Sequence, residues 1–176
     1  DTSGDGIIEL LKISGTGNNN NDGVKLTFAR VGNESCSITA KKVLDNNTTD
    51  LIFNTRSANT VSESLRIDGS GRLLVGTDTA RAVGGESNPV LHIEGAGNTS
   101  NSWINLTRFQ AGTGSANLQF AKSRSNTPGT YTVVQADDKL GQISFLGSDG
   151  TDMANYAAKI ESFVDGTPGS NDMPGR

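Results

Sequence analysis

The chain has 176 residues but only one cysteine, one histidine and one tryptophan, and aromatic residues make up 5% of it. Because Cys36 is alone, an intrachain disulfide and a cysteine-based metal cluster are both excluded. His92 is also alone, which excludes a metal site built from several histidines. The scarcity of aromatic rings disfavours a sugar-cleaving groove, since such grooves usually offer rings on which the substrate stacks.

Charge of either sign is modest as well. The chain has 15 Lys and Arg against 19 Asp and Glu, which gives a formal net charge of -4 at pH 7. A nucleic-acid-binding protein needs a surplus of positive charge to neutralise phosphates, so we expect no nucleic-acid partner. No apolar run approaches the roughly 20 residues that a membrane-spanning helix needs, so we expect no membrane insertion.

Hydrophobic residues make up only 33% of the chain, which also contains 22 glycines. This composition is too polar for a thick hydrophobic core. Charged residues, at 19%, are nevertheless too few for a chain that stays disordered through charge. Many short strands with one thin apolar face fit better, provided that neighbouring copies of the chain cover that face. We therefore predict an oligomer.

Residues 65–77, which read LRIDGSGRLLVGT, predict a short β-hairpin. Leu65 and Ile67 alternate with polar residues before the turn, and Leu73 and Val75 do so after it. The turn itself is Gly-Ser-Gly, and glycine suits it because tight connections between paired strands require positive φ.

This stretch, extended to SLRIDGSGRLLVGT, resembles the recurrent ERMRIDSSGNVGIGT module of tail fibres and related appendage proteins of tailed bacteriophages. It departs from the module at Ser64 and Leu65, where Arg and Met are usual, and at residues 73–75, where Val-Gly-Ile is usual. Both changes keep the alternation of a strand. The flanking segments DLIFNTRSANTVSES and NPVLHIEGAG also resemble the usual surroundings of the module. The resemblance implies an all-β, elongated, homotrimeric fibre made of short β-strand meanders.

Apolar residues that alternate with polar ones predict further strands. They cover residues 7–14, 24–28, 37–43, 50–55, 90–95, 103–109, 117–122, 131–134, 140–146 and 157–164. The run at 7–14 fits a short helix about as well, and 157–164 contains Ala, Lys and Glu, which favour helices. We choose strand for both, because glycine, asparagine or aspartate ends each run.

Weak self-similarity suggests a repeat. Residues 90–95 parallel 10–15, and residues 117–122 parallel 25–30, where both segments end in Phe-Ala followed by a basic residue. The alternative is chance, since alternation makes any two strands look alike. The conserved order of the two matches favours a real repeat.

We therefore predict two related β modules in tandem. The first module is residues 1–78 and ends in the RIDGSG hairpin, and residues 79–89 form a connector of small and polar residues. The second module is residues 90–176, which we expect to be truncated at its C-terminus.

Exposed loops are the candidates for contact with a receptor. Their residues are Asn98, Asn101, Trp103, Arg124 and Asn126. Trp103 is the one ring that could stack on a sugar, although packing at a seam between subunits is the favoured interpretation of it.

Six acidic residues are candidates for the paired carboxylates of a polysaccharide-cleaving tailspike. They are Asp137, Asp138, Asp149, Asp152, Glu161 and Asp165. The phenylalanines at 28, 53, 120 and 145 sit in strand patterns and are predicted to be core, which leaves few rings for a sugar groove. We therefore predict no catalytic residue and no enzyme.

No cofactor or metal site is predicted either. The opening DTSGDG has the spacing of a calcium loop, but Lys12 stands where a bidentate Glu is needed. Asp149 and Asp152 could hold a cation, yet Asp and Gly are ordinary turn residues. His92 alternates with Leu91 and Ile93 and is predicted to lie on the outer face of its strand.

The function we expect is that of a structural segment of a phage tail fibre, which supports host-cell attachment through many weak, simultaneous contacts. The expected location is the virion, on the tail or another external appendage. Expected partners are identical chains, other virion proteins, and a host surface glycan or protein. A head- or neck-attached fibre with a purely structural role is the alternative, and an enzymatic tailspike is less favoured.

Overall fold

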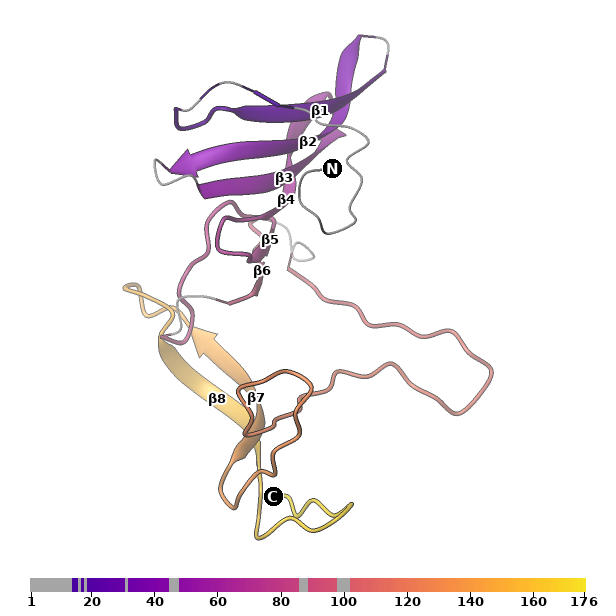
Figure 1. Cartoon of the computed structure of the whole chain (residues 1–176), viewed down its shortest axis with the longest axis vertical. Coiled ribbons are helices and arrows are strands. Elements are labelled where there is room, and N and C mark those ends of the chain that lie inside the picture. Colours follow the sequence, from indigo (N-terminus) through magenta and orange to yellow (C-terminus); the bar gives the residue numbers. More distant parts are fainter. Residues whose placement is uncertain are drawn as a thin grey trace, which may run out of the picture. The chain divides into compact units, whose positions relative to one another are not determined.

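The computed structural model describes residues 14–15, 17, 19–30, 32–44, 48–85, 89–97 and 102–176. These residues form eight β-strands and no helix, which confirms the all-β prediction (Figure 1). The chain divides into two compact units, of which the first is Asp1–Arg81 with Ser87–Trp103 and the second is Ala82–Glu86 with Ile104–Arg176. Residues 7–13 of the strand predicted at 7–14 lie outside the described residues.

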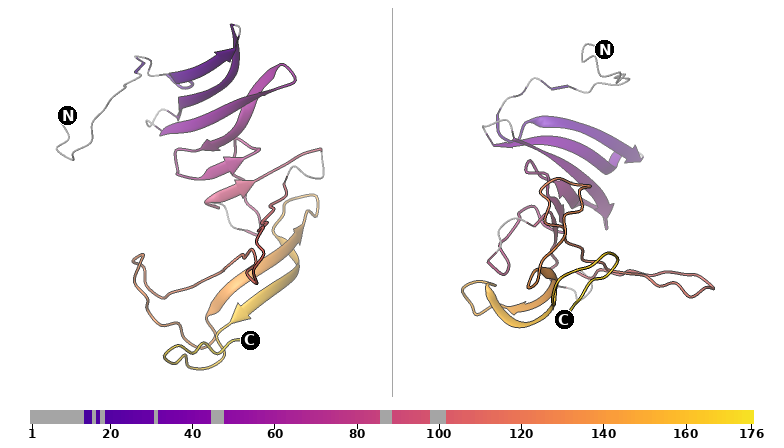
Figure 2. Two further views of the ribbon diagram at one scale, coloured as in Figure 1. Left: turned by 90° about the vertical axis from the view of Figure 1, so that its right-hand side faces the viewer. Right: turned by 60° about the horizontal axis from the view of Figure 1, so that its bottom comes forward.

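The first unit contains a six-stranded sheet whose strands follow one another in chain order (Figure 2). The strands are β1 (Gly23–Arg30), β2 (Asn33–Leu44), β3 (Thr48–Ser57), β4 (Thr60–Ile67), β5 (Leu73–Val75) and β6 (Leu91–Ile93). Strands β1 to β5 form an antiparallel meander, and β6 joins β5 in parallel. The predicted strands at 24–28, 37–43, 50–55 and 90–95 are confirmed as β1, β2, β3 and β6.

Strand β4 begins earlier than predicted, at Thr60, because a two-residue turn returns the chain directly from β3. The turn residues Ala58 and Asn59 have positive φ values of 45° and 69°. Two-residue hairpin turns of this kind usually contain glycine, so an Ala-Asn pair gives only a weak signal in the sequence.

Strands β4 and β5 form the hairpin predicted from residues 65–77, with Leu65 opposite Val75. Asp68 closes the turn between them, because its carbonyl oxygen accepts a hydrogen bond from the amide of Gly71 at 2.8 Å. The carboxylate of Asp68 accepts from two further backbone amides of the turn, at 2.9 and 3.0 Å. The RIDGSG motif therefore stabilises its own turn.

The predicted position of His92 on the outer face of its strand is wrong. The His92 side chain is 10% exposed, whereas the neighbouring Leu91 is 51% exposed. The register places His92 opposite Leu74, which is buried. His92 does lie on the opposite side of β6 from Leu91 and Ile93, as the alternation predicts. The parallel pairing with β5 decides which of the two faces is covered, and the sequence of neither strand reveals that pairing.

The second unit is built on a hairpin of β7 (Lys139–Gly147) and β8 (Asn155–Phe163). These strands confirm the predictions at 140–146 and 157–164, and the helical alternative for 157–164 is wrong. Beyond β8, Val164 is fully buried and exchanges backbone hydrogen bonds with the turn before β7, through Asp137 and Asp138. This backbone ladder fixes the start of β7 against the end of β8.

The strands predicted at 103–109, 117–122 and 131–134 do not form. Among the described residues, no backbone amide between 104 and 121 donates to a backbone carbonyl. The alternating pattern is present, but a strand requires a partner strand for its backbone groups. Residues 104–121 have no such partner in the described part of the chain, and at 131–134 the carbonyl oxygen of Thr132 accepts from the amide of Arg124 without forming a ladder. Residues 25–30 lie in β1 while the matching 117–122 is not a strand, and the tandem repeat stays a prediction.

Candidate interaction surface

Two rows of apolar side chains cross one face of the six-stranded sheet. The register aligns Val24, Ala40, Leu51, Ile67, Leu73 and Leu91 in one row and Leu26, Ile38, Phe53, Leu65, Val75 and Ile93 in the other. Phe28 extends this face along β1, two residues beyond Leu26. At about 4.8 Å between neighbouring strands, each row spans roughly 25 Å. We call this surface the apolar sheet face.

The apolar sheet face is partly exposed in the structure. The side chains of Leu26, Phe28, Leu51, Ile67, Leu73 and Leu91 are 36 to 51% exposed, and the other side chains of this face are half-buried. The prediction that Phe28 is a core residue is therefore wrong for the single chain, and Phe120 and Phe145 of the second unit are likewise about half exposed. Contiguous apolar patches of this extent on soluble proteins usually mark an interaction site.

The opposite face of the same sheet contains the buried groups. Ile52 and Leu74 are buried there together with the polar residues Ser37 and Asp50. The side-chain amide of Asn54 donates to the hydroxyl of Ser37 at 3.1 Å. The buried hydroxyl of Ser37 therefore has a hydrogen-bond partner within the chain.

An ion-pair cluster on this buried face anchors the RIDGSG turn. One guanidinium nitrogen of Arg66 lies 2.6 Å from the carboxylate of Asp50, and the guanidinium also binds both carboxylate oxygens of Glu63. The second oxygen of Asp50 accepts from the backbone amide of Gly69 at 2.9 Å. The hydrogen bonds to Glu63 raise the pKa of Arg66, so the guanidinium stays charged. The geometry of the cluster indicates a structural role.

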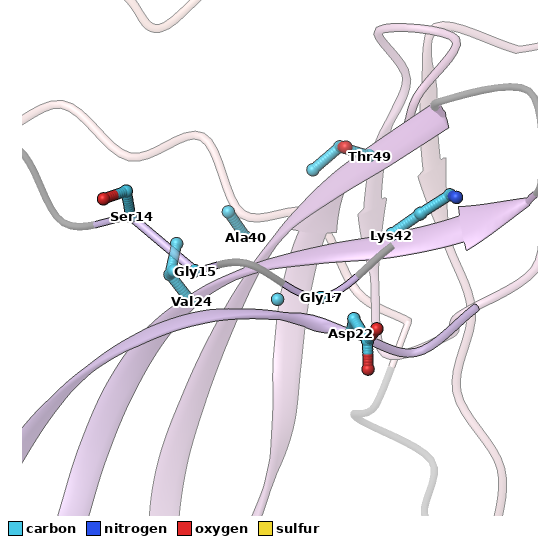
Figure 3. A pocket seen from close by; sticks show the side chains of 9 residues that line it. Ser14, Gly15, Gly17, Asp22, Val24, Ala40, Lys42 and Thr49 are labelled. Atoms are coloured by element: carbon cyan, nitrogen blue, oxygen red, sulfur yellow. The ribbon is translucent and has the colours of Figure 1, made fainter. Parts of the chain in front are cut away.

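A hollow of about 330 Å³ lies between residues 14, 15 and 17 and the strands β1, β2 and β3 (Figure 3). Its lining includes Ser14, Asp22, Val24, Lys42 and Thr49. The Asp22 carboxylate accepts a hydrogen bond from the backbone amide of Asn19 at 2.7 Å, which holds the turn before β1. The described lining lacks a nucleophile placed against a base, so no reaction can be assigned to it.

Of the predicted receptor-facing residues, Asn98 and Asn101 lie outside the described residues. Trp103 is 73% exposed. Arg124 and Asn126 lie in one loop, which surrounds a hollow of about 390 Å³. Arg124 forms an ion pair with Asp138, since its guanidinium donates two hydrogen bonds of 2.7 Å to that carboxylate. Contact of these residues with a receptor stays a prediction.

The acidic residues weighed as catalytic groups serve turns and ion pairs. The hydrogen bonds from Arg124 hold the pKa of Asp138 far below its ordinary value. Backbone amides of the following turn lower the pKa of Asp149, and the ammonium of Lys139 lowers that of Glu161. A glycosidase acid needs a raised pKa to stay protonated. These three carboxyls are therefore poorly suited to that role.

Asp137 and Asp165 bind a single arginine. The guanidinium of Arg176 lies 2.5 Å from the carboxylate of Asp137 and 3.0 Å from that of Asp165. Asp152 accepts a hydrogen bond from the backbone amide of Ala154 at 2.9 Å. All three side chains therefore act on the local fold of the second unit.

Within the described residues, no three His, Cys, Asp or Glu side chains gather closely enough to hold a metal ion. The same residues contain no helix with the length and apolarity required to cross a bilayer. Comparison with protein-family models, with curated proteins and with solved structures finds no match.

Proposed function

We propose that the chain is a structural segment of a phage tail fibre, which assembles as a homotrimer and supports attachment to the host cell. The apolar sheet face carries this proposal, because two apolar rows cross all six strands and six of the side chains on this face remain exposed in one chain. A second support is the resemblance of the RIDGSG hairpin to the fibre module.

The buried apolar content of one chain is small. Among the described residues, the buried hydrophobic side chains are Ile52, Leu74, Val134 and Val164. Burial of apolar surface is the main favourable term in folding. With such a small core, the stability of a domain of this size is marginal. Association of copies through the apolar sheet face adds the missing burial.

The resemblance to trimeric fibres favours three copies. Two sheets could also cover each other as a sandwich, so the number of copies needs a measurement. In a closed symmetric assembly, each copy presents the same face to its neighbours, which leaves no apolar row open for further growth.

Sedimentation equilibrium over a wide range of concentrations tests the assembly. We expect a mass three times the 18.3 kDa of the single chain, stable on dilution. A folded monomer would refute the trimeric segment, and a stable dimer would replace it with a two-sheet sandwich.

Electron microscopy with antibodies against the chain tests the location on phage particles that encode it. We expect label on thin external fibres of the tail, and antibody treatment should reduce adsorption to host cells. Label confined to the head or neck would reject the tail assignment.

A further inference from the structure

Residues 104–121 of the second unit form an extended loop, which we call the arm (Figure 1). Its outgoing limb carries Ile104, Leu106 and Phe109, whose side chains are 67, 52 and 95% exposed. Within the described chain, the two limbs of the arm are joined near the tip by a hydrogen bond from the guanidinium of Arg108 to the carbonyl oxygen of Ser115, at 3.5 Å. The outgoing limb therefore exposes apolar side chains, and among the described residues none of its backbone amides donates to a backbone carbonyl.

The β7–β8 hairpin of the same unit has an open apolar face. Ile143 lies opposite Ile160 in the register, and Phe145 lies opposite Ala158. Ile143, Phe145 and Ile160 are 42, 51 and 62% exposed. A two-stranded hairpin is at best marginally stable in water without a third strand or a covering layer.

The returning limb of the arm already contacts its own hairpin. A Cβ at Gly141 would lie 2.7 Å from the Cβ of Phe120, so the backbone of β7 passes directly under that side chain. Phe120, Ile143 and Ile160 border a hollow of about 280 Å³ on the hairpin. This volume is enough for an apolar side chain. The outgoing limb is left without a comparable contact.

We propose that the outgoing limb, residues 104–109, docks on the β7–β8 hairpin of a second copy of the chain. The limb places an apolar side chain in the hollow beside Phe120 and pairs its backbone with a free edge of the hairpin, as in β-strand addition. A second copy is the occupant because every chain carries both an open limb and an open hairpin. Reciprocal exchange around a symmetric oligomer satisfies all of them at once.

The composition of the limb agrees with this partner. In residues 104–109, Arg108 is the one charged residue, and the apolar residues at 104 and 106 alternate with Asn105 and Thr107. Residues 104–107 therefore have the period of two that a sheet partner requires, with Ile104 and Leu106 on one side, whereas Arg108 and Phe109 depart from this pattern. This proposal rests on the self-association proposed above and adds where the second unit takes part in it.

Hydrogen exchange of the full chain, measured by mass spectrometry, tests the proposal, with the variant Leu26→Asp as the monomeric reference. Amides 104–109 should exchange at least about a hundredfold more slowly in the assembled protein than in this monomer, since hydrogen-bonded amides exchange only on opening. Fast exchange of these amides in a stable trimer would overturn the arm proposal and leave the proposed function standing. A chain that stays monomeric would overturn both, and equal protection of these amides in the Leu26→Asp monomer would place the limb on its own hairpin.

A matched pair of variants tests the acceptor. Ile160→Asn changes the apolar side of β8, and Lys159→Asn changes the neighbouring residue on the other side. Both positions are exposed in the single chain, so far-UV circular dichroism should show that each variant folds. Ile160→Asn should abolish the protection of 104–109 and Lys159→Asn should retain it. Equal protection in both variants would exclude the hairpin as the acceptor.

Discussion

Arg66 of β4 reaches across to Asp50 of β3, with 2.6 Å between a guanidinium nitrogen and a carboxylate oxygen, and both side chains are at least 89% covered. Asp50 also accepts the hydrogen bond from Gly69 that begins the RIDGSG turn. Asp50→Asn removes a covered, charge-assisted hydrogen bond while Glu63 still neutralises Arg66, so it should lower the free energy of unfolding by about 2 kcal/mol. Urea denaturation followed by circular dichroism measures the change.

The exposed pair of Lys25 and Glu34 is the control for this prediction. Their side chains are 42 and 26% exposed, although the ion pair is equally short at 2.6 Å. Exposed ion pairs contribute about 1 kcal/mol or less, so Lys25→Ala should change stability little. If Asp50→Asn cost no more than Lys25→Ala, the buried cluster would not anchor the turn.

Gly71 and Gly76 are predicted to respond differently to alanine, although their φ values are almost equal at 79° and 76°. A Cβ at Gly71 would meet open space, whereas a Cβ at Gly76 would collide with the carbonyl oxygen of Glu94. Gly71→Ala should therefore cost about 1 kcal/mol, the usual penalty for a left-handed residue. Gly76→Ala should cost about 3 kcal/mol, because the β5 backbone must also move away from Glu94. Equal thermal unfolding temperatures for the two variants would contradict this close approach.

Local signals in the sequence were sufficient for much of the first unit. The hairpin at residues 65–77 could be predicted because apolar alternation and glycine turn chemistry agree there. The cluster of Asp50 and Arg66 could not, since it joins residues 16 positions apart on adjacent strands. The only signal for this cluster in the sequence is Arg66, a charged residue inside a run of alternating apolar residues.

The apolar sheet face shows a different limit of the sequence. Alternation predicts an apolar side for single strands, such as Leu26 with Phe28, and it predicts Phe28 as a core residue. Leu26, Ile38 and Phe53 lie in one row because of the pairing of β1, β2 and β3 and its register. Whether that row is core or surface depends on what covers it, which alternation does not encode. The arm shows the same limit, because the pattern of its outgoing limb is that of a strand, yet the described residues of its own chain supply no partner strand.

The pair of Arg124 and Asp138 should make stability depend on pH. Hydrogen bonds from Arg124 and from the amide of Gln135 lower the folded-state pKa of Asp138 below its unfolded value of about 3.9. The unfolded state then binds more protons. The contribution of this carboxylate is therefore fully present above about pH 5 and is lost as the pH falls below about 4, toward the folded-state pKa.

Carbon-13 NMR titration of the Asp138 carboxyl group checks this prediction. Arg124→Gln should raise the pKa of Asp138 toward about 3.9, because the two charge-assisted hydrogen bonds are lost. Lys122 acts on Asp138 only through its charge, as the last of the causes that lower this pKa, so Lys122→Gln should raise it less. Equal shifts in the two variants would mean that the hydrogen bonds from Arg124 do not dominate.

Leu26 and Thr27 are adjacent in β1 and point to opposite faces of the sheet, so they form a matched pair for testing self-association. Leu26 is 41% exposed in the apolar sheet face, and Thr27 is exposed on the other side. Leu26→Asp would place a charge against the neighbouring copies, which forfeits about 2 kcal/mol of apolar burial per copy and adds the cost of desolvating the carboxylate. We expect Leu26→Asp to sediment as a folded monomer at concentrations where Thr27→Asp remains a trimer. If both variants remained trimeric, the copies would associate through another surface, whereas loss of the trimer in both would indicate that β1 tolerates no charge on either face.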